Sequence, residues 1–82
     1  MTTMILDILT PTGALLSAEQ VSAVFLPGTM GEFEVLASHA PIISTLQAGQ
    51  IRYRTSAGEQ VASVASGFVI VDHDHIQACI EQ

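Results

Sequence analysis

The sequence contains no lysine and no tryptophan, and its only basic residues are Arg52 and Arg54. Eight acidic residues outweigh these two arginines and give a formal net charge of −6 at pH 7. Nucleic acids and anionic lipid headgroups are bound through cationic surfaces, so neither is an expected partner. The lack of lysine also excludes a domain that carries a swinging prosthetic group on a lysine side chain.

Cysteine and long apolar runs are also scarce. Cys79 is the only cysteine, which excludes an internal disulfide and fits a reducing compartment. No apolar stretch approaches the ~20 residues that a membrane-spanning helix needs. The first nine residues lack a basic segment, and Asp7 and Pro11 limit their apolar run, so no signal peptide is predicted. We therefore expect a soluble chain that reaches a membrane only through a partner.

What the sequence does have is apolar residues, which make up 49% of the chain, whereas only 12% of its residues are charged. Its 82 residues predict one domain over 1–82. A surface with so few charges must expose apolar area, and exposed apolar area often marks a protein interface. This composition indicates a subunit rather than a free monomer.

Short apolar segments recur along the chain with turn residues between them. Strands are predicted at residues 4–9, 14–17, 20–26, 33–36, 41–46, 50–55, 59–66, 68–72 and 75–80. The clearest unit is the hairpin over 50–66, in which Ile51 and Tyr53 face one way and Arg52 and Arg54 the other. Turns are expected at 10–13, 27–31 and 47–49. The pattern predicts an all-β fold, a flattened β-sandwich or barrel of roughly eight to ten short strands.

The segment 17–26 is compatible with either a helix or a strand. Over residues 17–26, Ser17 and Gln20 imitate a helix capping box, which favours a helix. If the segment is instead a strand, Val21, Ala23 and Phe25 share one face.

Two histidines suggest chemistry, and each has a structural alternative. On a strand, His73 and His75 of the segment DHDH would share a face and could bind a metal, but no further ligands occur at a diagnostic spacing. A polar hairpin turn is the alternative. His39 could act as a general base for Ser17, Ser38 or Ser44. The alternative is a histidine that fixes its loop through hydrogen bonds from both ring nitrogens.

The segment around Phe33 carries two carboxylates and follows two glycines. Glu32 and Glu34 would share a face, but acid–base chemistry needs a desolvated cleft, and here a solvated contact surface is expected. Gly28 and Gly31 do not form a phosphate-binding loop, because no lysine or helix follows them. Cys79 is interpreted as a small, half-buried apolar residue.

The segment GEFEVLASHAPIISTLQAGQIR, residues 31–52, resembles the F-type ATP synthase epsilon subunit. That family commonly runs Gly-Glu-x-Gly-Ile/Val-x-x-x-His-Ala-Pro, followed by an apolar pair. The opening LDILTPTGALLSAEQVSAVFLPG and the closing ASGFVIVDHDHIQACIE are similar to the family's first and last strands. The resemblance covers essentially the whole chain, and the His-Ala-Pro segment is its most specific part.

The resemblance implies the flattened β-sandwich of the epsilon N-terminal domain and a noncatalytic role in the central stalk of the rotor. The domain would join the gamma subunit to the ring of c subunits and couple ion translocation to ATP synthesis, with no cofactor and no small-molecule substrate. It would lie on the cytoplasmic side of the bacterial inner membrane. Thr29, Met30, Gly31 and Glu32 match the loop that meets the c ring, and Thr10 and His39 match positions at or near gamma. A free-standing adaptor of the same fold is the alternative, and an enzyme that uses His39 and a serine is a more distant one.

This sequence departs from the family pattern at three places. Glu34 stands where the family has a glycine, and Ala37-Ser38 stands where Pro-Gly usually precedes the histidine. Both changes reduce the backbone freedom of the loop. The family usually continues into a two-helix hairpin that can inhibit hydrolysis and, in some members, bind ATP. The given sequence stops at Gln82, so the resemblance carries neither property over.

Overall fold

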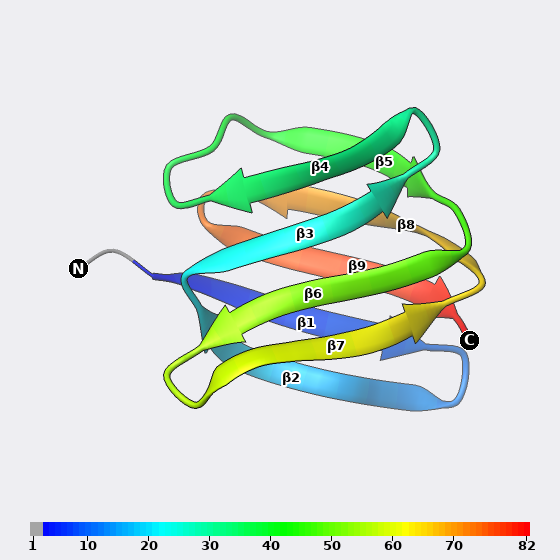
Figure 1. Ribbon diagram of the computed structural model, residues 1–82, viewed down its shortest axis with the longest axis horizontal. Coiled ribbons are helices and arrows are strands. Elements are labelled where there is room, and N and C mark those ends of the chain that lie inside the picture. The colour runs from blue at the N-terminus through cyan, green and yellow to red at the C-terminus, as the bar shows by residue number, and fades with distance from the viewer. Residues whose placement is uncertain (1–2) are drawn as a thin grey trace.

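The structure, a computed structural model, describes residues 3–82, so the first two residues of the predicted domain lie outside it. It contains nine strands (Figure 1): β1 Met4–Thr10, β2 Gly13–Val21, β3 Ala23–Gly28, β4 Gly31–Leu36, β5 Ile42–Leu46, β6 Gly49–Thr55, β7 Gly58–Val64, β8 Ser66–Asp72 and β9 His75–Glu81. The predicted all-β fold is confirmed. Among the described residues there is no helix long and apolar enough to cross a membrane.

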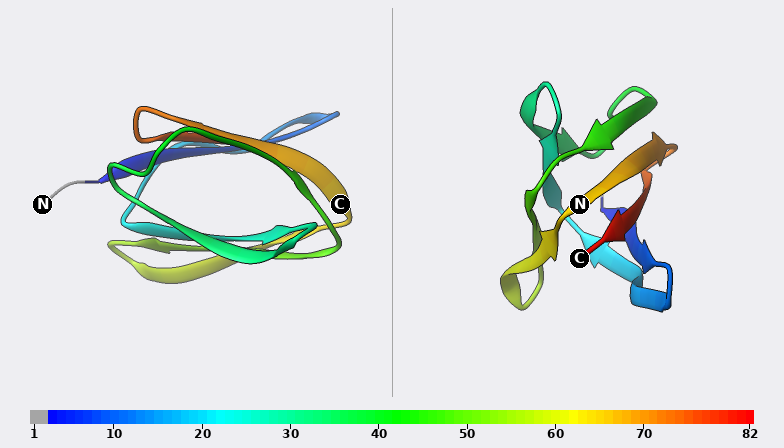
Figure 2. Two further views of the ribbon diagram at one scale, coloured as in Figure 1. Left: turned by 90° about the horizontal axis from the view of Figure 1, so that it is seen from above. Right: turned by 90° about the vertical axis from the view of Figure 1, so that its right-hand side faces the viewer.

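The strands form one curled sheet in the order β2-β1-β9-β8-β5-β3-β6-β7, and β4 pairs with the other edge of β3. Seen from the side, this sheet folds into two layers (Figure 2). One layer holds β2, β1, β9, β8 and β5, and the other holds β4, β3, β6 and β7. The two layers are joined where Gly28 of β3 pairs with Leu46 of β5. A sheet that curls back on itself in this way encloses a core between its two layers.

The pairing is antiparallel except between β1 and β9, which run parallel from Ile5↔His75 to Leu9↔Cys79. The hairpin β6–β7 appears where the alternating pattern predicted one, although β7 ends at Val64 rather than at residue 66, and β8–β9 forms a second hairpin. In β6, Ile51 is fully buried and Arg54 is exposed, so the predicted alternation is confirmed there.

Apolar side chains from both layers meet between them and form a single core. Among residues 3–82 no polar or charged side chain is fully buried. The core consists of Met4, Leu6, Ile8, Val21, Val24, Leu26, Val35, Leu46, Ile51, Val64, Val69, Val71, Ile76, Ala78 and Ile80. Removing this apolar area from water is the main force that holds the layers together.

The segment 17–26 is β-structure, so the helical alternative is wrong, and the predicted strands 14–17 and 20–26 have the wrong bounds. The strands β2 and β3 are separated at Ser22, whose amide donates to the carbonyl of Arg54 at 2.9 Å. This break shifts the alternation, so Val24 and Leu26 are buried while Phe25 lies on the outer face. The predicted loop 27–31 is also too long, since only Thr29 and Met30 lie between β3 and β4.

Candidate functional site

The turn between β3 and β4 stands at one end of the sandwich (Figure 1). Gly28 pairs with Gly31, so Thr29 and Met30 form the turn, and Met30 is 100% exposed. Gly31 has a φ of +126°, a conformation that residues with side chains rarely adopt. The four residues assigned to a ring contact, Thr29, Met30, Gly31 and Glu32, are thus neighbours at one hairpin tip, which we call the tip.

The tip is fastened at its base to the other layer. The amide of Thr29 donates to the carbonyl of Thr45 at 3.1 Å, and the two threonine hydroxyls lie 2.7 Å apart. The amide of Gln47 donates to the carbonyl of Pro27 at 2.9 Å. These bonds join β3 to the β5 end of the opposite layer, so a force applied at the tip reaches both layers.

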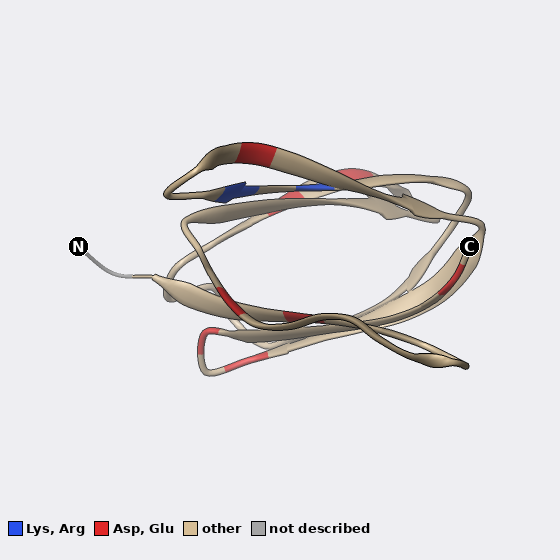
Figure 3. Cartoon of the chain, turned by 90° about the horizontal axis from the view of Figure 1, so that it is seen from below, with Lys and Arg blue, Asp and Glu red and all other residues tan. Residues whose placement is uncertain are grey.

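Glu32 lies within β4 and forms an ion pair, which differs from the solvated carboxylate expected from the sequence. Its Oε1 is 3.1 Å from a guanidinium nitrogen of Arg52 on β6, and about half of its side chain remains exposed. Arg52 also lies 3.8 Å from Glu59 on β7 and 4.5 Å above the ring centre of Phe25 on β3. Figure 3 shows both arginines on the same layer of the sandwich. Arg52 therefore connects the outer face of all four strands of this layer.

The other residues of this region have structural roles. Glu34 pairs with Phe25 in a regular antiparallel ladder, so the glycine-to-glutamate departure leaves the strand intact. Phe33 packs against the core between the two glutamates. A Cβ at Gly28 would lie 2.8 Å from a ring carbon of Phe33 and 2.8 Å from the carbonyl oxygen of Gly31. Gly28 thus gives room for the aromatic ring rather than for a ligand.

His39 lies in an exposed loop between β4 and β5. Its Nδ1 is 2.8 Å from the carbonyl of Ala40, and its amide donates to the carbonyl of Leu36 at 3.2 Å. The ring therefore makes one of the two nitrogen contacts expected from the sequence. Within residues 3–82 no hydrogen bond joins His39 to any of the three candidate serines, and Ser44 donates to the carbonyl of Thr45 instead. The arrangement offers no activated nucleophile.

The segment DHDH forms the two-residue turn between β8 and β9. Its central residues, His73 and Asp74, have φ values of 49° and 60°, as a type I′ hairpin turn requires. His73 lies 2.8 Å from Asp72, whereas His75 lies 2.6 Å from Asp7. The histidines thus bind different carboxylates, and the described residues contain no cluster able to hold a metal. The polar-turn interpretation fits this geometry.

Asp7 joins three strands, which local sequence patterns did not reveal. One oxygen accepts the amide of Ala18 on β2 at 2.6 Å, and the other lies 2.6 Å from Nε2 of His75 on β9. The bond from the Ala18 amide, and then the bond from His75, hold the pKa of Asp7 below its ordinary value of 3.8. Ala18 has a φ of 54° at an irregularity in the β1–β2 pairing, so Asp7 supports this irregularity. The only hint in the sequence was an acidic residue inside an apolar strand.

Thr10 and His39, which were both assigned to gamma, lie at opposite ends of the sandwich. Thr10 ends β1, and its hydroxyl donates to the carbonyl of Gly13 at 2.8 Å. Figure 1 shows the end of β1 on the side of the tip and the β4–β5 loop on the other side. The molecule measures 32 × 24 × 18 Å along its principal axes. A partner that contacts both residues must therefore cover the length of a face.

Such a face exists on the outer side of the β1-β9-β8-β5 layer. Leu9, Cys79 and Phe68 pair across three strands, and Ile70 pairs with Ile43 beside them. Phe68 is 43% exposed and Ile43 is 80% exposed. We call these five residues the apolar face.

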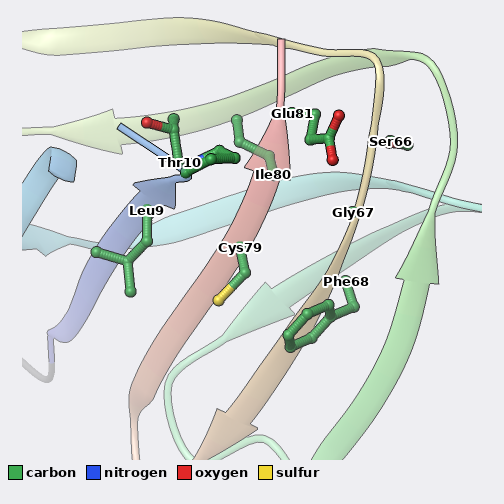
Figure 4. Close-up of a pocket in the computed structure, with 9 residues that line it drawn as sticks. Leu9, Thr10, Ser66, Gly67, Phe68, Cys79, Ile80 and Glu81 are labelled. Atoms are coloured by element: carbon green, nitrogen blue, oxygen red, sulfur yellow. The ribbon is translucent and has the colours of Figure 1, made fainter. Parts of the chain in front are cut away.

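A shallow hollow lies at each end of the apolar face. One, of about 370 Å³, is lined by Leu9, Phe68 and Cys79 together with Thr10 and Pro11 (Figure 4). The other, of about 390 Å³, lies between the residues around Pro41 and the end of β8. The apolar face thus extends from the neighbourhood of Thr10 to that of His39.

Comparison with known proteins identifies relatives of this chain. The family model described as the beta-sandwich domain of the ATP synthase delta/epsilon chain matches residues 3–82. ATP synthase epsilon chain 2 of Syntrophotalea carbinolica is 36% identical over 76 residues, which are 93% of this chain and 54% of that relative. The ATP synthase epsilon chain of Staphylococcus aureus is 31% identical over 81 residues, which are 99% of this chain and 60% of that relative. The chain therefore spans little more than half of these relatives.

Solved structures share the fold. A chain of the Euglena gracilis mitochondrial ATP synthase, in a structure of OSCP/F1/c-ring, superposes with a TM-score of 0.91 at 22% identity, covering 98% of this chain and 51% of that chain. A chain in the central stalk/c-ring structure of the Tetrahymena thermophila mitochondrial ATP synthase gives a TM-score of 0.83 at 14% identity, covering 99% and 65%. At these identities the likeness concerns the fold alone.

Proposed function

Because the chain belongs to the beta-sandwich domain family of the ATP synthase delta/epsilon chain, we propose that it is a noncatalytic central-stalk subunit of an F-type ATP synthase. In this role it joins the gamma subunit to the c ring and couples translocation of protons or sodium ions to ATP synthesis. It acts as a peripheral subunit on the cytoplasmic side of a bacterial inner membrane. The observation that carries the proposal is the family match over residues 3–82.

The tip is the proposed contact with the c ring. Met30 is fully exposed, and Glu32 adds a half-exposed carboxylate beside it. A carboxylate suits polar ring loops that carry arginine, because opposite charges at an interface fix its register and speed association. The bonds from Thr29 to Thr45 give this contact a stiff base, which torque transmission requires.

The apolar face is the proposed contact with gamma. It lies between Thr10 and His39, and its apolar side chains are of the kind that protein interfaces bury. Because the tip lies at one end of the sandwich and the apolar face along one side, gamma and the ring can be bound together. A subunit with this arrangement resists slipping between its two partners.

Co-purification with gamma tests this proposal. Tagged chain is expected to retain the purified gamma subunit, and Phe68→Ser is expected to weaken this by roughly tenfold, because an interface aromatic residue commonly contributes more than 1 kcal/mol. Val61→Ser is the matched control, because Val61 is 53% exposed on the outer face of the other layer. If wild-type chain retains neither gamma nor the c ring, the rotor role is wrong and an adaptor with another partner replaces it. If both variants weaken gamma binding equally, the apolar face is not the contact with gamma, but the rotor role stands.

A further inference from the structure

Two segments far apart in the sequence, the His39 loop and the β8–β9 turn, are bonded to each other. The amide of Ser38, just before His39, donates to Oδ1 of Asp74 in the β8–β9 turn at 2.6 Å, although 36 positions separate the two residues. The backbone carbonyl of Asp74 also accepts the amide of Ile5 on β1 at 2.9 Å. One turn residue thus fastens the His39 loop with its side chain and β1 with its backbone.

Both residues of this bond have unusual backbones. Ser38 has a φ of 67° and Asp74 a φ of 60°. An L residue is strained in this left-handed region because its Cβ crowds the following carbonyl, and it stays there only where its surroundings hold it. The bond to Asp74 therefore holds a turn that glycine would adopt without help.

The direction of the loop depends on this turn. The amide of His39 closes it by donating to the carbonyl of Leu36 at 3.2 Å, and Pro41 then leads into β5. Pro41 and Asp72 line the same hollow at the end of the apolar face, so the end of the loop and the end of β8, which leads into the β8–β9 turn, form its two sides. If Ser38 lost its left-handed backbone conformation, His39 would move and the shape of this hollow would change.

We propose that Asp74 is a positioning residue for partner binding: its carboxylate holds Ser38 and thereby presents His39 and the adjoining hollow to the gamma subunit. Asp74 itself is only partly exposed and acts through the loop. This inference rests on the proposed function for the identity of the partner. The order of the loop is a property of the chain alone.

The test compares four chains: wild type, Asp74→Gly, Asp74→Asn and His73→Gly. Glycine at 74 removes the acceptor and also the backbone strain, so the turn stays stable while the loop is released. Asparagine keeps an oxygen acceptor and tolerates the left-handed conformation. His73→Gly is the matched control, because His73 is in the same turn, has the same backbone conformation and bonds only to Asp72 among the described residues.

Three quantities are measured: the free energy of unfolding, the amide exchange rate of Ser38, and the affinity for the purified gamma subunit. Asp74→Gly is expected to speed exchange at Ser38 and weaken gamma binding, each by roughly tenfold, the loss expected for one hydrogen bond to a charged group. Asp74→Asn is expected to stay within about threefold of wild type on both measures, since it keeps the acceptor. His73→Gly is expected to match wild type on both.

The outcomes distinguish the positioning role of Asp74 from the proposed function of the chain. If wild-type chain binds gamma and Asp74→Gly binds equally well, the positioning role is overturned while the proposed function stands. If His73→Gly weakens gamma binding as much as Asp74→Gly does, the positioning role of Asp74 is also overturned, because the effect then belongs to the turn as a whole. If wild-type chain does not bind gamma, the proposed function and the role of Asp74 toward gamma fall together.

Discussion

The guanidinium carbon of Arg52 lies 4.5 Å from the ring centre of Phe25, and from this position Arg52 also reaches Glu32 and Glu59. We expect Arg52→Gln to lower the free energy of unfolding by about 1 kcal/mol, the sum of a cation–π contact and weak surface ion pairs. Urea denaturation measures this change.

Arg54→Gln is the control for this variant. It removes the same charge from the same strand and face, and Arg54 forms no ion pair within residues 3–82. Its effect should stay within about 0.5 kcal/mol, as for ordinary surface substitutions. Equal losses for the two arginines would mean that net charge, rather than the contacts of Arg52, stabilises this layer.

Glu32 and Glu59 both pair with Arg52, but only Glu32 lies at the tip. Glu32→Gln is therefore expected to reduce ATP-driven ion pumping in reconstituted synthase, while Glu59→Gln leaves it unchanged. The two variants should lose similar, small amounts of stability, about 0–1 kcal/mol each, because surface ion pairs contribute little. Equal pumping by both variants would argue against a ring contact through Glu32. We avoid lysine at this position because it would face Arg52 and confuse repulsion with lost contact.

The Asp7 carboxylate makes the stability of the sandwich depend on pH. Its pKa in the folded chain lies below the ordinary value of 3.8, so its stabilising effect is complete above pH 3.8 and is lost as pH falls through the lowered value. Asp7→Asn is expected to lower the free energy of unfolding by about 1.5–3 kcal/mol at pH 6, the usual value for hydrogen bonds to a charged group. The difference in the free energy of unfolding between wild type and Asp7→Asn should become smaller below pH 3.8.

Asp72→Asn serves as the comparison for Asp7→Asn. Asp72 also contacts a histidine, but this pair is exposed in the β8–β9 turn. Its loss should cost at most about 0.5 kcal/mol. A gap between wild type and Asp7→Asn that stays constant down to pH 2 would show that the charge of Asp7 does not stabilise the fold.

Gly67 in β8 lies directly against the backbone of β9. A Cβ at this position would overlap the carbonyl oxygen of Cys79 and lie 2.9 Å from Cα of Ile80. Gly67→Ala should therefore cost more than about 2 kcal/mol, because crowding forces the backbone apart. Gly58→Ala is the control: its φ of +113° is strained for alanine, but no atom lies within 4 Å of the new Cβ. Thermal unfolding of both variants separates the effect of crowding from that of backbone strain. If the two variants lose similar amounts of stability, crowding at Gly67 is not the cause.

The sequence predicted best where structure is local. Alternation over β6 correctly separated the side of Ile51 from the side of the two arginines, because neighbours in a strand face opposite sides whatever the strand pairs with. It failed near Ser22, because the break between β2 and β3 depends on a bond to Arg54 on another strand. The bounds of short strands depend in this way on pairing that local patterns do not contain.

The contacts of the candidate site could also not be predicted from local sequence patterns. The residues of the tip are contiguous and were identified together from family resemblance, but the ion pair of Glu32 depends on β3 lying between β4 and β6. Asp7 and His75 meet because β1 and β9 are neighbours, which no periodicity indicates. The apolar face likewise appears only when four strands are placed in order.

The parallel pairing of β1 with β9 has a consequence for how this chain is made. Almost every other residue of the domain lies between these two strands, so the sheet closes only after the segment ending at Glu81 has left the ribosome. Until then β1 has a free edge next to Asp7 and exposed apolar side chains. Folds dominated by such distant pairings form in roughly milliseconds to seconds. Until β9 is available, the nascent domain therefore presents an unpaired strand edge, which is a template for pairing with a wrong strand.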